Sequence, residues 1–495
     1  MVIVTTEKYL KTIDEVIATG KFKDNWQSLS EHKIPEWYYR GKLGIFIHWG
    51  IYSVPAFGNE WYSRSMYDPG VREFEYHRKT YGNQKDFGYK DFIPLFKGEK
   101  FDAERWVQVF RQAGAKFVLP VAEHHDGFAM YDTVFNRWNA ANMGPCVDVI
   151  GELKKAAEAN GLQFCASTHR AEHYFFMNMG RAFDSDVNDE AYADFYGPAV
   201  YTQEFTSEQL GTTTETPSAT GPSEEWLRDW MVRTCELIDK YQPKVLYFDW
   251  WIQNHAFKPY LKKIAAYYYN RADEWGEAVT INYKHEAFPP GVGTLDVERG
   301  ALAEISPAPW QTCTAIGKQS WGYRADNEYK SSRQVICDLI DIVSKNGILL
   351  LNIGPKADGT FTQEETEVLA DLGSWLKVNG EGIYDTTPWK WFAEGDVYAE
   401  SGCFKDNDEK AYTVADFRFT DRGGALYAFQ MRPDGKEARI TTLAERGMRD
   451  FVISHVELLG CEQKLQYRRD SSGLRVDVPA GVDVSKPICF KIHFA

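Results

Sequence analysis

Residues 116–125 read KFVLPVAEHH, an apolar run that ends abruptly in three polar, titratable side chains. Similar runs recur along the chain, and each ends in polar or aromatic residues: LGIFIHWG, LQFCASTH, KVLYFDWW, EAVTINYKH and GILLLNIGP. Amphipathic helical patterns such as AERWVQVFRQAG lie between several of them. Short buried strands that alternate with amphipathic helices are typical of βα units. The sequence therefore predicts an α/β protein built on a parallel sheet.

The number of these units favours a closed parallel barrel over an open Rossmann sheet. Six or more βα units over roughly 350 residues indicate a (β/α)8 barrel of the TIM type rather than a Rossmann sheet. No G-x-G-x-x-G motif follows the first strand, which weakens the dinucleotide-binding alternative. In a barrel the carboxyl ends of all strands meet at one face, where the active site lies. One shared cleft is therefore expected to hold the residues that end the strands: His48, His124, His125, His169, Asp249, Lys284 and Asn352.

The pattern changes near residue 390. Short alternating runs such as ALYAFQMR and LRVDVPA follow, separated by Gly, Asp and Pro turns. This pattern is typical of a small antiparallel β-sandwich. We therefore expect a catalytic barrel over residues 1–388 and a C-terminal β-sandwich over residues 389–495. Residues 205–223, rich in Thr, Ser, Gly and Pro, are interpreted as a long loop or lid.

The composition argues against several classes of partner. The net charge of −15 argues against nucleic acid or an anionic membrane as a partner, because such binding needs clustered Lys and Arg. No apolar stretch approaches the roughly 18 residues of a membrane span.

The N-terminus lacks a basic stretch followed by an apolar one, so a cytoplasmic protein is expected, although a secreted form with its signal removed would look the same. No cysteines have C-x-x-C spacing, which argues against a zinc ribbon.

Asp249 is the first candidate for catalysis. It lies between Phe248 and Trp250 at the end of an apolar run, and burying a carboxylate there is costly unless it is hydrogen-bonded or used. A helix cap or a buried ion pair would explain it, but the adjacent Trp250 and Trp251 favour a platform for a sugar ring. Glycoside hydrolysis needs a second carboxylate. The spacing does not choose among Glu60, Glu286, Asp296, Glu298 and Glu304. Residues 294–324 are interpreted as a loop over the barrel face.

Five stretches together carry a resemblance to a known family. They are GIFIHWGIYSVPAFGNEWYSRSMY, AEHHDGFAMYDT, YFDWW, WQTCTAIGKQSWGYR and NGILLLNIGPKADG. In this order, over residues 36–386, they resemble the α-L-fucosidases of glycoside hydrolase family 29. The resemblance implies a (β/α)8-like barrel followed by a β-sandwich. It also implies hydrolysis with retention through a covalent glycosyl-enzyme, with no metal and no cofactor.

The resemblance also implies roles for individual residues. Asp249 matches the nucleophile. The fucose-binding residues would be His48, Glu60, Trp61, His124 and His125, with Trp321 against the C5 methyl group and Lys284, His169 and Tyr174 as further ligands. The position of the acid/base varies in the family, and one family position is occupied here by Gln311. Glu298 is the first choice for this role, Glu304 the second and Glu60 the third.

The expected function is removal of terminal α-L-fucose from a fucosylated glycan or oligosaccharide by an exo-acting enzyme. Two histidines at a strand end also suit a metal-dependent hydrolase, and a purely structural corner is the third interpretation. Sugar binding is favoured, because neutral imidazoles have one donor and one acceptor for hydroxyl groups. A fucose-binding lectin without catalysis, suggested by Gln311, and an α-L-galactoside hydrolase are the alternatives.

Overall fold

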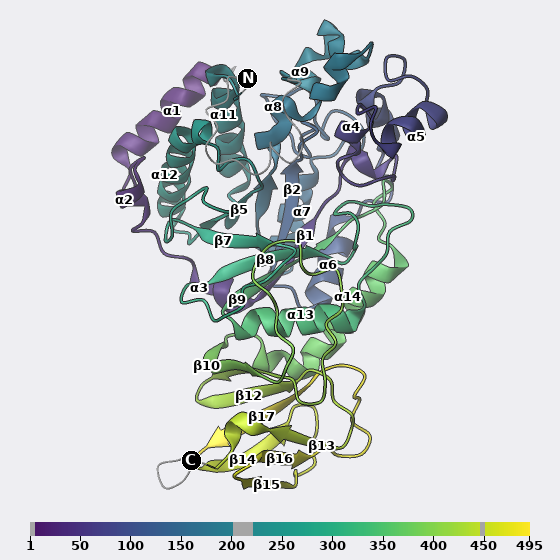
Figure 1. Cartoon of the computed structure of the whole chain (residues 1–495). Helices are drawn as coiled ribbons and strands as arrows, with labels where there is room; N and C mark the ends of the chain where they lie inside the picture. The colour runs from purple at the N-terminus through teal and green to yellow at the C-terminus, as the bar shows by residue number, and fades with distance from the viewer. Residues whose placement is uncertain (1–4, 201–220, 446–450) are drawn as a thin grey trace.

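The structure is a computed structural model that describes residues 5–200, 221–445 and 451–495. A closed parallel barrel forms its centre (Figure 1). Its strands, in spatial order, are β1 (Leu43–Ile47), β2 (Phe117–Glu123), β3 with β4 (Gln163–Phe164 and Ala166–Thr168), β5 (Val245–Phe248), β6 (Thr280–Tyr283), β7 (Thr294–Glu298), β8 (Trp310–Ala315) and β9 (Gly347–Ile353). β9 pairs with β1 and β1 with β2, which closes the ring. The predicted TIM-type barrel is confirmed.

Alternation along each strand divides the barrel residues between two cores. In β1, Phe46 faces the barrel interior, where it joins Leu119 and Leu350 in one apolar cluster. The flanking Ile45 and Ile47 belong to the larger core outside the strands. Successive side chains of a strand point to opposite faces, so a strand buried on both sides is a continuous apolar run. This explains why LGIFI is buried throughout.

Among the described residues, six helices cover the outside of the barrel: α6 (Ala103–Gln112), α7 (Val149–Ala159), α11 (Glu224–Tyr241), α12 (Lys258–Trp275), α13 (Ser332–Ser344) and α14 (Gln363–Asn379). α1 (Thr6–Thr19) packs on α11 and α12, and α2 (Trp26–Leu29) and α3 (Glu36–Gly41) lead into β1. Short helices α4 (Tyr62–Ser65), α5 (Arg72–Thr80), α8 (His173–Phe176) and α9 (Ala193–Tyr196) belong to the long connections after β1 and β4. Among the described residues, no helix is long and apolar enough to cross a membrane.

The interpretation of residues 294–324 as a loop is wrong for two parts of that segment. Residues 294–298 and 310–315 are the barrel strands β7 and β8. The apolar pattern was missing because both strands carry buried polar residues, including Asp296, Glu298 and Gln311. Neither residues 284–293, before β7, nor residues 299–309, after it, contain a helix. The alternation with helices that identified the other strands therefore stops here.

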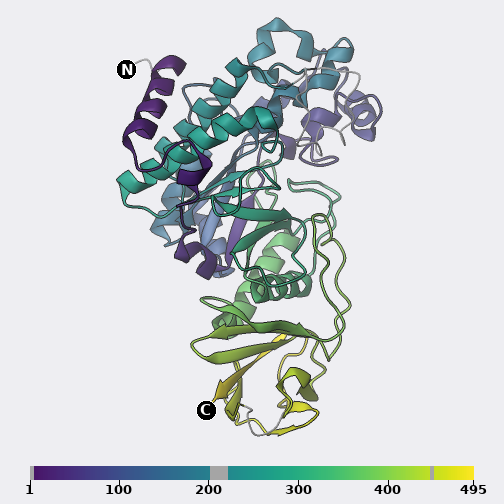
Figure 2. The same cartoon turned by 60° about the vertical axis from the view of Figure 1, so that its left-hand side comes forward.

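The C-terminal region is an antiparallel sandwich below the barrel (Figure 2). One sheet has the order β10 (Thr387–Glu394), β11 (Phe417–Arg422), β12 (Ala425–Gln430), β17 (Ile488–Phe494) and β14 (Ile453–Leu458). The other has the order β13 (Glu437–Ile440), β16 (Gly473–Asp477) and β15 (Tyr467–Asp470). The predicted sandwich is confirmed. The first strand of the sandwich, β10, begins at Thr387. The domain boundary expected between residues 388 and 389 stays a prediction.

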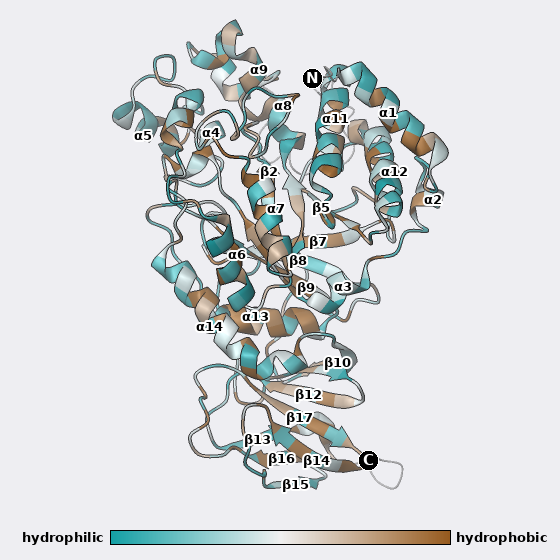
Figure 3. Cartoon of the chain, turned by 180° about the vertical axis from the view of Figure 1, so that it is seen from behind, coloured by the Kyte–Doolittle hydropathy of each residue, from teal (hydrophilic) through white to brown (hydrophobic). Residues whose placement is uncertain are grey.

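Helix α13 lies between the two parts of the chain. It contacts β9 of the barrel on one side and β10 and β11 of the sandwich on the other. It is mostly brown in Figure 3, as expected for a helix buried on more than one face. The lid suggested for residues 205–223 lies, except for residues 221–223, outside the described residues.

Candidate active site

A cavity of about 480 Å³ opens at the carboxyl ends of the barrel strands. Ten of the eleven residues predicted for the site line it: His48, Glu60, Trp61, His124, His125, His169, Asp249, Lys284, Glu298 and Trp321. They come from segments that are up to 273 positions apart in the chain, from residue 48 to residue 321. The barrel brings them together because all its strands end at this face.

Asp249 follows directly after β5 and contacts three basic side chains. Its Oδ2 accepts a hydrogen bond from His169 Nδ1 at 3.0 Å and lies 3.4 Å from His125 Nε2. Its Oδ1 lies 3.5 Å from Lys284 Nζ. Burial raises the pKa of Asp249, but His169, Lys284 and His125 outweigh burial and hold it well below its usual range. Asp249 is therefore a carboxylate at neutral pH.

Lys284, at the end of β6, is shared by three buried carboxylates. Its Nζ lies 2.5 Å from Glu298 Oε2, 3.4 Å from Asp296 Oδ2 and 3.5 Å from Asp249 Oδ1. Burial lowers the pKa of Lys284, but Cys313 and these carboxylates raise it well above its usual value. A fixed positive charge therefore lies at the bottom of the cavity, among three acidic groups.

Glu298 ends β7 and has a different electrostatic environment from Asp249. Its Oε2 accepts hydrogen bonds from Lys284 Nζ and Trp250 Nε1. Burial and the charge of Asp249 raise the pKa of Glu298, and Lys284 and Trp250 offset this only in part. Two carboxyl groups of one cavity thus have pKa values shifted in opposite directions, which is the pattern of an acid and a nucleophile.

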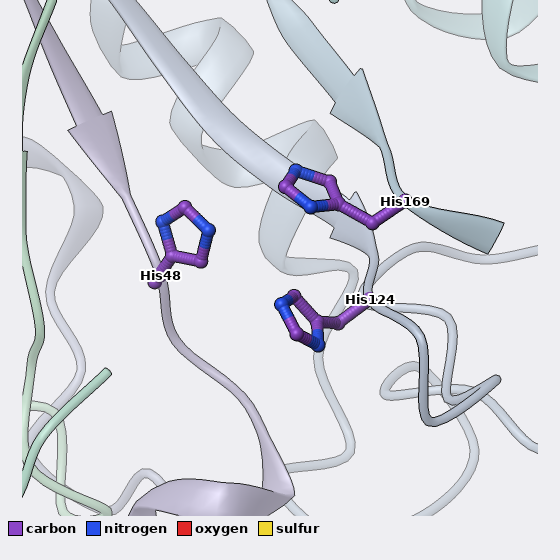
Figure 4. Close-up of side chains that lie close together, drawn as sticks. All are labelled: His48, His124 and His169. Carbon is purple, nitrogen blue, oxygen red and sulfur yellow. The ribbon is translucent and has the colours of Figure 1, made fainter. Parts of the chain in front are cut away.

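Three histidines face one another across the cavity (Figure 4). Burial holds the pKa values of His48, His124 and His169 below the usual range, so all three rings are neutral. His48 Nδ1 donates to Asn352 Oδ1 at 2.6 Å, because Asn352 Nδ2 donates elsewhere, to Trp321 O. Its Nε2 is therefore an acceptor. Nδ1 of His124 has no hydrogen-bond partner among the described residues.

His125 differs from these three rings. Its Nδ1 donates to the carbonyl of His169 at 2.8 Å, and its Nε2 faces Asp249. Burial lowers the pKa of His125, but Glu172 and Asp249 outweigh burial and raise it to about 9. The expectation of a neutral imidazole at this position is therefore wrong. His125 carries a proton on both nitrogens at neutral pH, because the negative charges of Glu172 and Asp249 both favour its protonated form.

Nitrogen and oxygen atoms of the same residues could also hold a metal ion. One group is His48, His124 and His169, and a second is His125, His169 and Asp249, with ligand atoms within 4.8 Å of one another in each. The first group suits a metal better, since neutral imidazoles bind metal ions. In the second group, His125 is protonated and His169 donates its Nδ1 proton to Asp249, which leaves little free ligand capacity.

Glu60 connects two loops at the cavity wall. It lies in the connection after β1, and its Oε2 accepts hydrogen bonds from Ser320 Oγ at 3.0 Å and the backbone N–H of Trp321 at 2.8 Å. The Trp321 ring is thereby held 5.2 Å from the His48 ring. The Trp61 ring also lines the cavity, 5.8 Å from the His125 ring. The cavity thus combines aromatic walls with many hydrogen-bonding groups, as a sugar site does.

Comparison with known proteins agrees with this arrangement. The family model described as α-L-fucosidase matches residues 10–381. The chain belongs to the α-L-fucosidase family. Human plasma α-L-fucosidase is 31% identical over 479 residues, which cover 93% of this chain and 89% of the relative. The crystal structure of Thermotoga maritima α-fucosidase superimposes with a TM-score of 0.74 at 27% identity, covering 95% of this chain and 100% of the other. The same bacterial enzyme has been solved in complex with fucose, with 27% identity, a TM-score of 0.73, and 95% and 99% of the two chains covered.

Membership of the α-L-fucosidase family makes the chain a glycoside hydrolase whose substrates carry fucose. The human relative is named as a plasma enzyme, so the cytoplasmic location expected from the N-terminus stays a prediction.

Three residues lie away from where the α-L-fucosidase resemblance suggested. Tyr174 on α8 does not line the cavity; it is buried behind it and accepts a hydrogen bond from Trp251 Nε1 at 2.8 Å. Glu304 is exposed and also lies outside the cavity. Gln311 is buried in the barrel interior, where Nε2 donates to Asp296 Oδ1 at 2.6 Å and Oε1 accepts from Tyr38. Gln311 is therefore part of the barrel core.

Other cavity residues of this α-L-fucosidase were missed in the sequence. Arg64, Glu172 and Phe404 line the cavity, and Glu172 is the main group that raises the pKa of His125. Glu172 follows three positions after the strand-ending His169, so a search of the first turn after each strand would have found it. Phe404 lies more than 50 residues beyond the last barrel strand, and no local pattern connects it to the site.

Proposed function

We propose that this chain hydrolyses terminal α-L-fucosides with retention of configuration, using Asp249 as nucleophile and Glu298 as acid/base. The supporting observation is that both carboxylates contact one ammonium group, at 3.5 Å and 2.5 Å from Lys284 Nζ. The two contacting oxygens can therefore be no more than about 6 Å apart, which fits the roughly 5–5.5 Å of retaining enzymes better than the roughly 6.5–9.5 Å of inverting ones.

The electrostatics favour this division of roles. The depressed pKa of Asp249 keeps it ionised for attack on the anomeric carbon. The raised pKa of Glu298 favours the protonated form, which can give its proton to the leaving oxygen. A fucosyl ester of Asp249 forms and the alcohol leaves. Glu298, now a carboxylate, takes a proton from water while the water oxygen attacks the anomeric carbon, and α-L-fucose departs.

The remaining cavity residues suit the ring of the sugar. Nε2 of His48 is an acceptor, and Nδ1 of His124 has no hydrogen-bond partner within the described part of the chain. Buried polar atoms without partners are costly, so sugar hydroxyls that pair with them would gain binding energy. The partly exposed face of Trp321 offers an apolar surface for the C5 methyl group. The bacterial relative solved with fucose supports the same ligand.

The lectin alternative loses its supporting feature. It depended on Gln311 occupying the place of a catalytic carboxylate, and Gln311 is a barrel-core residue. The metal-dependent alternative retains the histidine group of Figure 4. Extensive dialysis against a chelator distinguishes it, because a metal-dependent enzyme would lose activity and regain it with the ion.

The deciding experiment is turnover of an aryl α-L-fucoside by the wild type, Asp249→Gly and Glu298→Gly, with and without azide. Both variants should lose most activity. Azide should rescue Glu298→Gly to give α-fucosyl azide, since it displaces the enzyme ester, and Asp249→Gly to give β-fucosyl azide by direct attack. Proton NMR of the wild-type reaction should show α-fucose first. Near-normal turnover by Asp249→Gly, or β-fucose as the first product, would overturn the proposal.

A further inference from the structure

Phe404 is an exposed aromatic residue at the rim of the active-site cavity. It lines the cavity, yet 61% of its surface is open to solvent. It belongs to residues 401–406, here called the strap, within the connection from β10 to β11. The strap therefore comes from the C-terminal part of the chain, although the side chain of Phe404 reaches a site built by the barrel.

Backbone hydrogen bonds fix the strap against the connection that follows β7. The N–H of Gly402 donates to Ala301 O at 3.0 Å, that of Phe404 to Glu298 O at 2.9 Å, and that of Lys405 to Arg299 O at 2.7 Å. A side chain at Gly300 would collide with the carbonyl of Gly402, so the two segments are in close contact. The strap is thus anchored to the backbone of Glu298 itself.

The strap holds the Phe404 ring beside the aromatic partner of Glu298. The rings of Phe404 and Trp250 are nearly parallel, with an angle of 19° and 6.4 Å between centroids. Trp250 Nε1 donates to Glu298 Oε2. Since Glu298 must reach the oxygen that leaves the fucose, the group on the far side of that oxygen lies next to these two rings.

We propose that Phe404 and Trp250 form a leaving-group subsite that binds the pyranose ring to which the fucose is attached. This assignment rests on the proposed role of Glu298. One face of a pyranose presents C–H groups and suits an open aromatic face, whereas its hydroxyl edges stay in water. Phe404 supplies such a face at the cavity mouth. The C-terminal region thereby selects the sugar on the leaving side, through a single side chain.

The backbone at residue 404 allows a clean test. Its φ of +59° is a conformation that glycine adopts without strain, so Phe404→Gly removes the ring while favouring the same strap geometry. Tyr398→Ala is the matched control, because Tyr398 is an aromatic residue of the same connection, 49% exposed, that does not line this cavity. The substrates are α-L-fucosyl fluoride, whose leaving group is one atom, and α-L-fucosyl disaccharides with galactose or N-acetylglucosamine.

For Phe404→Gly, kcat/KM for the disaccharides should fall by about ten-fold, mainly through KM, because truncating an aromatic side chain that a bound ligand covers costs affinity on this scale. Turnover of fucosyl fluoride should be unchanged, and Tyr398→Ala should match the wild type on both substrates. Equal loss on fluoride and disaccharide, or no loss on either, would overturn the subsite while leaving the hydrolase intact. Failure of the wild type to cleave fucosyl fluoride would instead overturn the proposed function.

Discussion

Lys284 Nζ lies 2.5 Å from Glu298 Oε2, so the proposed proton donor is in direct contact with a cation. The same ammonium also contacts Asp249 and Asp296. Without it, His125 beside Asp249 would be the nearest remaining positive charge, and the repulsion between Asp249 and Glu298 would raise the pKa values of both. Lys284 is therefore expected to set the pH range in which one group is ionised and the other protonated.

Lys284→Met should move the whole pH profile of kcat/KM to higher pH. Lys284 lowers the pKa of Asp249, so its loss raises the pH at which the nucleophile ionises and moves the acid limb upward. It also lowers the pKa of Glu298, so the limb at which the acid loses its proton moves in the same direction. Lys284→Arg keeps the charge and should keep both limbs near their wild-type positions. Unchanged limbs in Lys284→Met would show that other groups set the two pKa values.

Glu60→Gln and Glu304→Gln should separate the remaining acid/base candidates. Glu304 is exposed outside the cavity, so its substitution should leave kcat and KM unchanged. Glu60 fixes the Trp321 loop through two hydrogen bonds, and bonds to charged groups contribute about 1.5–3 kcal/mol each. Glu60→Gln should therefore raise KM, and azide should restore nothing. Azide rescue of Glu60→Gln, with the α-azide as product, would transfer the acid/base role from Glu298 to Glu60.

The strand ends could be predicted because a barrel converts them into one site. His48, His124 and Asp249 each follow an apolar run, and each run is a strand whose neighbours are also strands. β7 and β8 broke this pattern, since their inward residues Asp296 and Gln311 bind each other in the barrel interior. These two polar side chains can be buried because each is the hydrogen-bond partner of the other. They interrupt the apolar run in each strand, so neither segment has the pattern of a buried strand.

Local sequence patterns did not show which loop residues contact the active-site cavity. The resemblance to the α-L-fucosidases implied Tyr174 as a ligand, but its side chain lies behind the cavity, where its hydroxyl accepts a hydrogen bond from Trp251. Phe404 reaches the cavity only because backbone hydrogen bonds dock the strap on the connection after β7. Such placements depend on tertiary packing between segments far apart in the chain, and the resemblance to the α-L-fucosidases did not extend to residue 404.

Glu172→Gln should lower the pKa of His125 from its value of about 9, because Glu172 is the largest of the groups that raise it. The change can be followed by NMR titration of the His125 ring protons in the free enzyme. Glu304→Gln is the control, since it removes one carboxylate of the same kind outside the cavity. If His125 titrates at the same pH in Glu172→Gln and in the wild type, then Asp249 alone maintains its charge.

Asp341→Asn should destabilise the whole chain, because Asp341 joins the barrel to the sandwich. Its Oδ1 lies 2.5 Å from Arg418 Nε of β11, and its Oδ2 lies 2.6 Å from Lys345 Nζ. All three side chains are buried, so the variant leaves two cations without a counter-charge, which costs about 3–5 kcal/mol in the free energy of unfolding. Urea titration measures this loss.

The pH dependence of that loss has a definite sign. Burial raises the pKa of Asp341, but Lys345 and Arg418 outweigh it and hold the pKa far below its usual range. A carboxylate with a depressed pKa stabilises the folded state above its unfolded pKa of about 4, and the effect disappears as the pH falls through the folded pKa. The difference between wild type and Asp341→Asn should therefore be constant above about pH 5 and shrink in acid.

The control for Asp341→Asn is Asp326→Asn, which removes an exposed partner of Arg324 and should cost less than about 1 kcal/mol. Equal losses in the two variants would mean that the buried pair contributes no more than a surface one.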